Sequence, residues 1–141
     1  MKNDVEKVFN KFQMALIGNA TEPYSDRVVE LVYEPLNVAE MDDPDGIGFA
    51  KGSCGDSMQV FLRLTKGCIS EATFLSVGCS VTLACGSAVT DLVIGKTPYE
   101  AGKIYPQTVV NYLHGLPASH MHCAVLAVQS LRKALDSMKS S

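Results

Sequence analysis

The residues that could do chemistry lie in three short, separated clusters, which are Cys54-Gly55-Asp56, Gly78-Cys79 and His122-Cys123. Together the clusters offer three thiols, a carboxylate and an imidazole. Ligands of these soft and borderline types make a site for iron or zinc when a fold brings them together. No pair has the C-x-x-C spacing of a zinc ribbon or a thioredoxin active site, so the site has to be assembled from separate loops. A site built in this way can stay open and reactive.

The three clusters lie at positions where chain elements are expected to begin or end. Cys54 and Asp56 are two residues apart in a turn or extended segment, so their side chains can point the same way. Cys79 lies between an expected strand and an expected buried helix, and Cys123 directly precedes the last expected helix. A helix N-terminus stabilises a thiolate. We therefore expect Cys123, beside His122, to have a lowered pKa and to react fastest with an electrophile in the metal-free protein.

The remaining cysteines and histidines have simpler interpretations. Cys85 lies among small residues in the middle of an expected helix, where a cysteine usually acts as a small hydrophobic residue. Cys68 lies beside a Lys-Gly turn and is expected to be partly exposed. His114 and His120 flank a Gly-Leu-Pro turn. We expect His114 to face solvent, and His120 to be close enough to the site to serve as a ligand or proton donor.

The spacing of apolar residues changes along the chain and indicates the elements that must position the clusters. After a turn at residues 42–46, apolar residues alternate with other residues in three runs, which are residues 47–50, 58–64 and 71–76. Alternation of this kind is typical of strands, and the short connections between the runs favour an antiparallel meander. Apolar residues spaced three and four apart predict helices at residues 4–17 and 124–138. Ser25 as an N-cap and Pro35 as a stop predict a helix at 25–33, and small and apolar residues on most faces predict a largely buried helix at 80–94. Pro98 and Pro106 each suit the first turn of a short helix.

These elements predict an α+β protein, a three-stranded antiparallel sheet with helices packed on one face and an extra N-terminal helix. At 141 residues the chain is expected to form one such domain. A net charge of −3 with scattered lysines and arginines argues against a nucleic-acid partner. The N-terminus carries too many charges for a secretory signal, and no apolar run approaches the ~20 residues of a membrane span. We therefore expect a cytoplasmic protein with no membrane partner, whose cysteines are thiols or ligands.

Several stretches of the sequence resemble, in order, the NifU/IscU-type iron–sulfur cluster assembly scaffolds. The resemblance covers about residues 24–138, which predicts an N-terminal helical extension at 1–23 followed by a scaffold domain at 24–141. The combination of the three cysteine motifs at these separations is highly specific. The stretches are Tyr24-Ser25-Asp26-Arg27-Val28-Val29, Pro35-Leu36-Asn37-Val38, Cys54-Gly55-Asp56, Gly78-Cys79, Gly95-Lys96-Thr97 and Leu116-Pro117 followed by His122-Cys123-Ala124.

The resemblance implies a carrier without turnover chemistry of its own. Such a protein takes sulfur from a cysteine desulfurase, assembles a [2Fe–2S] cluster on its own residues and passes the cluster to apo-proteins. The implied cluster or metal ligands are Cys54, Asp56, Cys79, His122 and Cys123, and Cys123 is the implied persulfide acceptor. A [2Fe–2S] cluster needs four terminal ligands. Because there are five candidates, one ligand can be exchanged during assembly or release of the cluster. Because Asp56 is a hard oxygen donor among soft sulfurs, we expect it to keep the cluster transferable.

Two features depart from the family pattern. Many relatives carry a Leu-Pro-Pro-Val-Lys stretch that a dedicated Hsp70-type chaperone binds, whereas this chain has Leu116-Pro117-Ala118-Ser119-His120. The departure weakens the expectation of that partner. The second feature is the helix expected at residues 4–17, which shorter family members lack. Its apolar stripe could cover the domain or mediate self-association as a homodimer.

Other readings of the same site stay open. The chain could be a zinc-bound sulfur acceptor that relays persulfide from a cysteine desulfurase, although it lacks the long insertion between Cys79 and Cys123 seen in that branch. Zinc could also occupy the site of a scaffold in isolated protein. A zinc hydrolase would need a general base beside the metal-bound water. Asp56 could fill that role, but the sequence indicates no substrate pocket.

Overall fold

The computed structural model describes residues 24–53 and 55–138, so Cys54 and the helix expected at 4–17 lie outside the described residues. The expected helices and strands are present in the described part. Ser25 caps the first of them, where its hydroxyl accepts a hydrogen bond from the Val28 amide at 3.0 Å. The elements are, in chain order, α2 (Asp26–Tyr33), β1 (Gly46–Lys51), β2 (Ser57–Thr65), β3 (Cys68–Val77), α3 (Ser80–Val93), α4 (Pro98–Ala101), α5 (Pro106–Tyr112), the short 3-10 helix η1 (Ala118–His120) and α6 (Met121–Met138).

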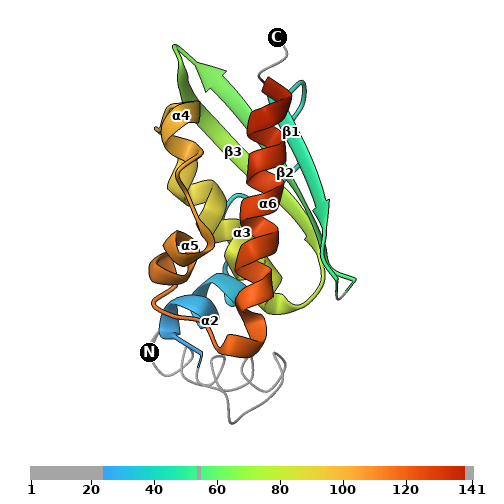
Figure 1. Ribbon diagram of the computed structural model, residues 1–141, viewed down its shortest axis with the longest axis vertical. Helices are drawn as coiled ribbons and strands as arrows, with labels where there is room; N and C mark the ends of the chain where they lie inside the picture. Colours follow the sequence, from blue (N-terminus) through green and yellow to red (C-terminus); the bar gives the residue numbers. More distant parts are fainter. Residues whose placement is uncertain (1–23, 54, 139–141) are drawn as a thin grey trace.

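The three strands form an antiparallel sheet in the order β1-β2-β3. Val60 at the centre of β2 pairs with Gly48 of β1 on one side and with Phe74 of β3 on the other. Helices α3 and α6 pack against one face of this sheet (Figure 1). The structure thus confirms the predicted α+β architecture. No helix in the described part of the chain is long and apolar enough to cross a membrane.

Strand β1 places its smallest residues toward α6. A Cβ atom built on Gly48 would lie 2.2 Å from the backbone nitrogen of Ala134, so only glycine allows the helix to approach this closely. On the other face of the same strand, Ile47 is 43% and Phe49 is 52% exposed. The alternation in β1 therefore separates glycine and alanine, which face the helix, from large apolar residues, which face outward.

This contact gives a prediction for stability. Replacing Gly48 with Ala should lower the free energy of unfolding by about 1–3 kcal/mol, the usual cost of overpacking a tight contact. Ile47→Ala on the outer face is the matched control and should cost below about 1 kcal/mol. Denaturant unfolding followed by circular dichroism measures both. A Gly48→Ala protein as stable as the control variant would mean that β1 and α6 are not closely packed.

The core and the site share the same elements. Fully buried residues of α3, among them Ala84, Cys85 and Ala88, pack with residues of β3 and α6. A Cβ atom on Gly86 would lie 2.2 Å from the ring of Phe74, so this helix also sits close to the sheet. The start of β2, the end of β3 and the N-termini of α3 and α6 all lie at the end of the molecule that α2 occupies (Figure 1). The described residues of the three predicted clusters belong to this end.

Candidate metal centre

Four of the five expected ligand residues are brought together. One ligand atom each from Asp56, His122 and Cys123 lies within 4.8 Å of the others. The sulfur of Cys79 is 3.9 Å from the sulfur of Cys123. These four residues, which we call the ligand group, come from the start of β2, the end of β3 and the start of α6. Cys54, the fifth, lies outside the described residues.

Two glycines make room for Asp56. The amide of Gly52 donates a hydrogen bond of 2.7 Å to the carbonyl of Asp56, which closes the turn before β2. A Cβ atom on Gly52 would meet the carboxylate oxygen Oδ1 of Asp56 at 2.3 Å. Gly78 has a φ of +147°, and a Cβ atom there would meet the Cβ of Asp56 at 2.7 Å. Both glycines are therefore required where the backbone closes around this carboxylate.

The Asp56 carboxylate is buried without a partner. The residue is 4% exposed, and neither carboxylate oxygen has a hydrogen-bond partner among the described residues. A buried carboxylate without hydrogen bonds is costly, and coordination of a metal ion is one of the usual ways to compensate it. The neighbouring donors are one imidazole and two thiols, a set that suits iron or zinc. The donor set and the unpaired carboxylate therefore fit a metal centre.

Cys79 is the N-cap residue of α3 and is exposed. The Cys123 thiol donates a hydrogen bond to its sulfur and lowers the pKa of Cys79 to about 4, against the opposing effect of partial burial. The hydroxyl of Thr82 and the amides of Val81 and Thr82 lower it further. These amides lie in the first turn of α3, and the helix N-terminus favours an anion at this position. Cys79 is thus a thiolate that solvent can reach.

Cys123 differs from the sequence prediction. It lies in the first turn of α6, which begins at Met121, and it is 0% exposed. Its thiol donates to the Cys79 sulfur, which raises the pKa of Cys123, and burial raises it further. The expectation of a lowered pKa at Cys123 was therefore wrong. Two thiols at this distance titrate as a pair, and the sulfur that solvent and helix amides reach loses its proton first. His122, whose Nε2 is 3.6 Å from the Cys123 sulfur, does not reverse this order.

The order of ionisation predicts which thiol reacts first. In the metal-free protein, iodoacetamide should modify Cys79 ahead of Cys123. The rate at Cys79 should be nearly constant between about pH 6 and pH 8, because its thiolate is already formed, whereas an ordinary thiol gains about tenfold per pH unit there. Peptide mapping by mass spectrometry at short reaction times identifies the modified residue. Faster modification of Cys123 would restore the original expectation and contradict the structure.

Thr82 is a polar residue of the site that the sequence analysis missed. It is 0% exposed, and its Oγ1 lies 3.5 Å from the sulfur of Cys79 and 3.5 Å from that of Cys123. One hydroxyl therefore contacts both thiols of the ligand group. Its position three residues after the N-cap Cys79 is the signal that could have found it, because side chains at that spacing share one side of a helix start.

Substitutions can separate the effect of the Thr82 hydroxyl on the pKa of Cys79 from the effect of the volume of the side chain. In Thr82→Val the shape is kept and the hydroxyl is lost, so the pH at which Cys79 becomes reactive should rise by about one unit, the order expected for one hydrogen bond to a charged group. Thr82→Ser keeps the hydroxyl and should behave like the parent. The pH profile of iodoacetamide modification at Cys79 measures the shift. Coincident profiles for the Val and Ser variants would show that the hydroxyl does not act on this thiolate.

The other cysteines and histidines lie outside the ligand group. Cys85 is fully buried in α3, and burial raises its pKa, as expected for a core residue. Cys68 is partly exposed at the start of β3, and His114 is exposed, both as predicted. The ring of His120 stacks on that of His122 with centroids 6.2 Å apart, so His120 lies beside the group without joining it.

The fold of the described residues is similar to that of solved proteins. The likeness lies in the three-stranded sheet and the helices packed on it. One of these proteins is the N-terminal part of a NifU-like protein from Brucella abortus, with a TM-score of 0.70, 14% identity, and coverage of 83% of this chain and 94% of that one. Another is a SUF-system scaffold protein, described as putative, from Fervidobacterium islandicum, with a TM-score of 0.64, 20% identity, and coverage of 79% and 96%. At these identities the likeness concerns the fold.

Sequence comparison then shows the family. Residues 23–141 match the NifU-like N terminal domain. The chain is 37% identical over 113 residues to an iron–sulfur cluster assembly scaffold protein IscU of Archaeoglobus fulgidus, covering 79% of this chain and 74% of the relative. It is 33% identical over 122 residues to the IscU scaffold of Haemophilus influenzae, covering 83% and 96%. The chain belongs to the NifU/IscU family, as the sequence analysis predicted.

Proposed function

We propose that this chain is a scaffold on which an iron–sulfur cluster is assembled and from which the cluster is transferred to apo-proteins. The observation that carries the proposal is the ligand group itself, in which a buried carboxylate with no hydrogen-bond partner among the described residues lies beside two thiols and an imidazole. Family membership supports the same function, because relatives at 33–37% identity are named as such scaffolds. The cluster is cargo, so the site has to bind it and also release it.

The ligand group supplies what a [2Fe–2S] cluster requires. Such a cluster takes four terminal ligands, and we propose that Asp56, Cys79, His122 and Cys123, with Cys54 as a fifth candidate, provide them in changing combinations. Asp56 contributes a hard oxygen donor that binds iron less tightly than a thiolate does in such a cluster. Release to an acceptor then begins at the weakest ligand.

Sulfur delivery uses the two thiols of the group. Cys123 is the proposed persulfide acceptor, but it is buried, whereas the Cys79 thiolate is exposed and 3.9 Å away. We propose that the Cys79 thiolate first attacks the outer sulfur of a desulfurase persulfide. A new S–S bond forms at Cys79, and the desulfurase cysteine leaves as a thiolate. The Cys123 thiolate then attacks the outer sulfur of the Cys79 persulfide, a new S–S bond forms at Cys123, and Cys79 leaves as a thiolate. His122, 3.6 Å from the Cys123 sulfur, is placed to take the Cys123 proton.

The partners follow from this chemistry. A cysteine desulfurase supplies the sulfur, and apo iron–sulfur proteins receive the cluster. The Ala118–His120 turn of η1 replaces the proline, valine and lysine of the chaperone-binding stretch in relatives, so we do not include a dedicated Hsp70-type partner.

Anaerobic assembly tests the proposal. The protein is incubated with ferrous iron, cysteine and a catalytic amount of a cysteine desulfurase, and the visible spectrum, iron and acid-labile sulfide are followed. A scaffold should develop a visible iron–sulfur chromophore with iron and sulfide in equal amounts. Protein that stays colourless and retains no sulfide would contradict it.

A zinc-bound sulfur acceptor is the second candidate. One specific observation favours it, because a carboxylate, an imidazole and two thiols also suit the tetrahedral coordination of zinc. In that case the purified protein should hold zinc, and the desulfurase should load persulfide onto a cysteine without forming a chromophore. Elemental analysis of protein purified without oxygen, with mass spectrometry of the persulfide, separates the two candidates.

A further inference from the structure

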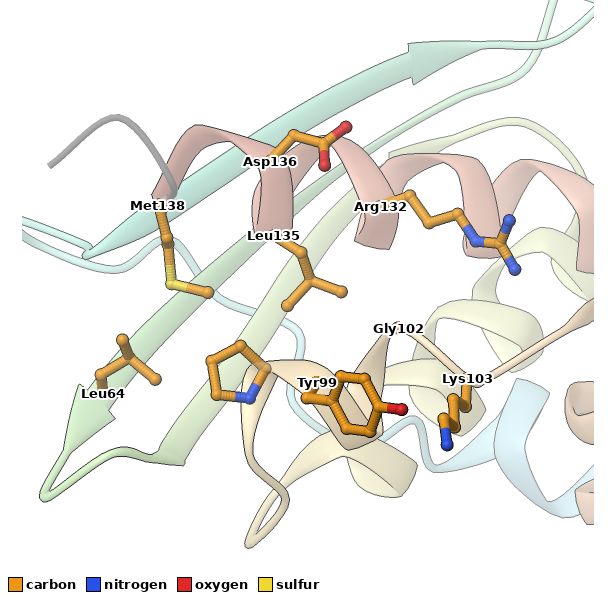
Figure 2. Close-up of a pocket in the computed structure, with 9 residues that line it drawn as sticks. Leu64, Tyr99, Gly102, Lys103, Arg132, Leu135, Asp136 and Met138 are labelled. Carbon is orange, nitrogen blue, oxygen red and sulfur yellow. The ribbon is translucent and has the colours of Figure 1, made fainter.

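A pocket of about 600 Å³ lies at the other end of α6 from the ligand group. Helix α4, the end of β2 and the C-terminal part of α6 form it (Figure 2). Leu135 in this pocket follows Cys123 by twelve residues, which corresponds to roughly 18 Å along the helix. Nothing in the proposed assembly reaction uses this pocket.

One half of the pocket is apolar. Leu135 and Met138 of α6 are largely buried and line it together with Leu64 of β2 and Pro98 of α4. Figure 2 shows Leu64, Leu135 and Met138 on the side of the pocket away from Lys103 and Arg132. The volume is in the range of sites that accept a large apolar side chain or a small ligand. This half would bury an apolar group that is otherwise exposed to water.

The other half carries two cations that aromatic rings hold in place. The ammonium nitrogen of Lys103 is 4.4 Å from the centroid of the Tyr99 ring. The guanidinium of Arg132 lies 5.0 Å from the Tyr105 ring centroid and donates a hydrogen bond of 3.2 Å to the carbonyl of Ile104. Such contacts reduce the side-chain entropy that an anion would otherwise have to remove on binding.

One acidic residue, Asp136, also lines the pocket. Figure 2 shows its carboxylate directed away from Leu135 and Tyr99. The whole chain has a net charge of −3, so an acidic ligand is repelled in general and attracted locally at Lys103 and Arg132. This charge distribution favours a ligand whose carboxylates lie beside an apolar group.

We propose that this pocket is a docking site for a segment of a partner protein in which a large apolar side chain is flanked by carboxylates. Tyr99, which lines the pocket, and Tyr105, whose ring contacts Arg132, are 74% and 54% exposed. Exposed tyrosines with an adjacent arginine are the residue types that dominate protein interfaces. A partner that binds here leaves the ligand group accessible at the far end of α6. The pocket would thus be a second binding site, separate from the ligand group and additional to the proposed scaffold function.

Nuclear magnetic resonance of the full-length metal-free protein tests the proposal with defined probes. The probes are capped heptapeptides with a central Leu, Phe or Met between pairs of Glu, and the control peptides carry Gln in place of Glu or Ser in place of the central residue. At least one acidic apolar peptide should shift the amide signals of Tyr99, Gly102, Lys103 and Leu135 in a saturable manner. The signals of Cys79 and Cys123 should stay unchanged.

Charge variants provide the second measurement. Lys103→Glu should weaken binding of the acidic peptide about tenfold, because it replaces an attractive contact with a repulsive one. Lys51→Ala, which removes an exposed lysine on β1 outside the pocket, is the control and should leave binding unchanged. Lys103→Glu should also assemble a cluster like the parent when free sulfide replaces the desulfurase. The docking proposal and the scaffold proposal can therefore fail independently.

Three results would overturn the docking proposal. The first is that no peptide of the acidic apolar set shifts signals at the pocket. The second is that the Gln peptides bind as well as the Glu peptides, which would exclude recognition of carboxylates. The third is equal binding by the Lys103→Glu and Lys51→Ala proteins. Shifts that centre on the ligand group instead would assign the peptide to that end of the molecule and would likewise contradict the proposal.

Discussion

Replacing Asp56 with Ala should make the metal-free protein more stable and slow the loss of a bound cluster. The carboxylate is 4% exposed and has no hydrogen-bond partner among the described residues. A group of this kind costs about 1–3 kcal/mol in the metal-free state, so its removal should raise Tm by several degrees. With the cluster bound, the variant loses its hard oxygen donor and keeps only softer ligands. Transfer of iron to a chelator should then take several times longer than in the parent.

Two measurements separate these effects. Thermal unfolding of metal-free protein reports the cost of burying the carboxylate, and Asp56→Asn, which keeps the shape and removes the charge, is the matched variant. Loss of the chromophore to a chelator reports the strength of cluster binding. A less stable metal-free protein for both variants would show that Asp56 has a partner that compensates its charge. Faster loss of the cluster from Asp56→Ala would end the idea that this residue keeps the cluster transferable.

Replacing Cys123 with Ala should nearly abolish cluster assembly. Cys123 is the central residue of the ligand group, because its sulfur lies 3.9 Å from that of Cys79 and 3.6 Å from Nε2 of His122. Loss of an outer partner of a metal ligand typically costs 10–100-fold in affinity, and loss of the ligand itself should cost about as much or more. Iron and acid-labile sulfide per protein after anaerobic assembly should therefore fall about tenfold or further.

Cys85→Ala is the matched control for this experiment. Cys85 is also fully buried, lies in α3 and is outside the ligand group. Its replacement should lower stability modestly and leave the iron and sulfide content close to that of the parent. Equal iron and sulfide content in the two variants, whether high or low, would contradict the claim that cluster assembly depends on Cys123 and not on Cys85.

The fold could be predicted from the sequence to a large extent because its signals are local. The alternating runs indicated all three strands, and the spacing of apolar residues indicated α6. The Ser25 cap indicated α2, and the small and apolar composition of residues 80–94 indicated α3. Thr97 begins α4 with a capping box to Glu100, and Pro98 is the first residue of the helix, as their residue types indicate. The start of α6 was placed three residues late, because His122 and Cys123 do not continue its apolar stripe.

The site was predictable in composition and less so in its electrostatics. The gathering of Asp56, Cys79, His122 and Cys123 followed from their positions at element junctions. The pKa order of the two thiols did not, because it depends on which sulfur is exposed and on the 3.9 Å between them. Neither quantity is visible in sequence spacing. The spacing of Thr82 from Cys79 could have indicated its contact with that thiol, but its contact with Cys123 joins two helices that are distant in the sequence.

X-ray absorption at the iron edge of the anaerobically assembled protein tests the central claim most directly. The claim is that Asp56, Cys79, His122 and Cys123 bind one common iron–sulfur unit. The predicted spectrum shows an iron neighbour of each iron, bridging sulfides, and a terminal shell that mixes sulfur with nitrogen or oxygen. A spectrum with no iron neighbour and only nitrogen or oxygen ligands would contradict the claim, because iron would then be bound singly and without sulfide.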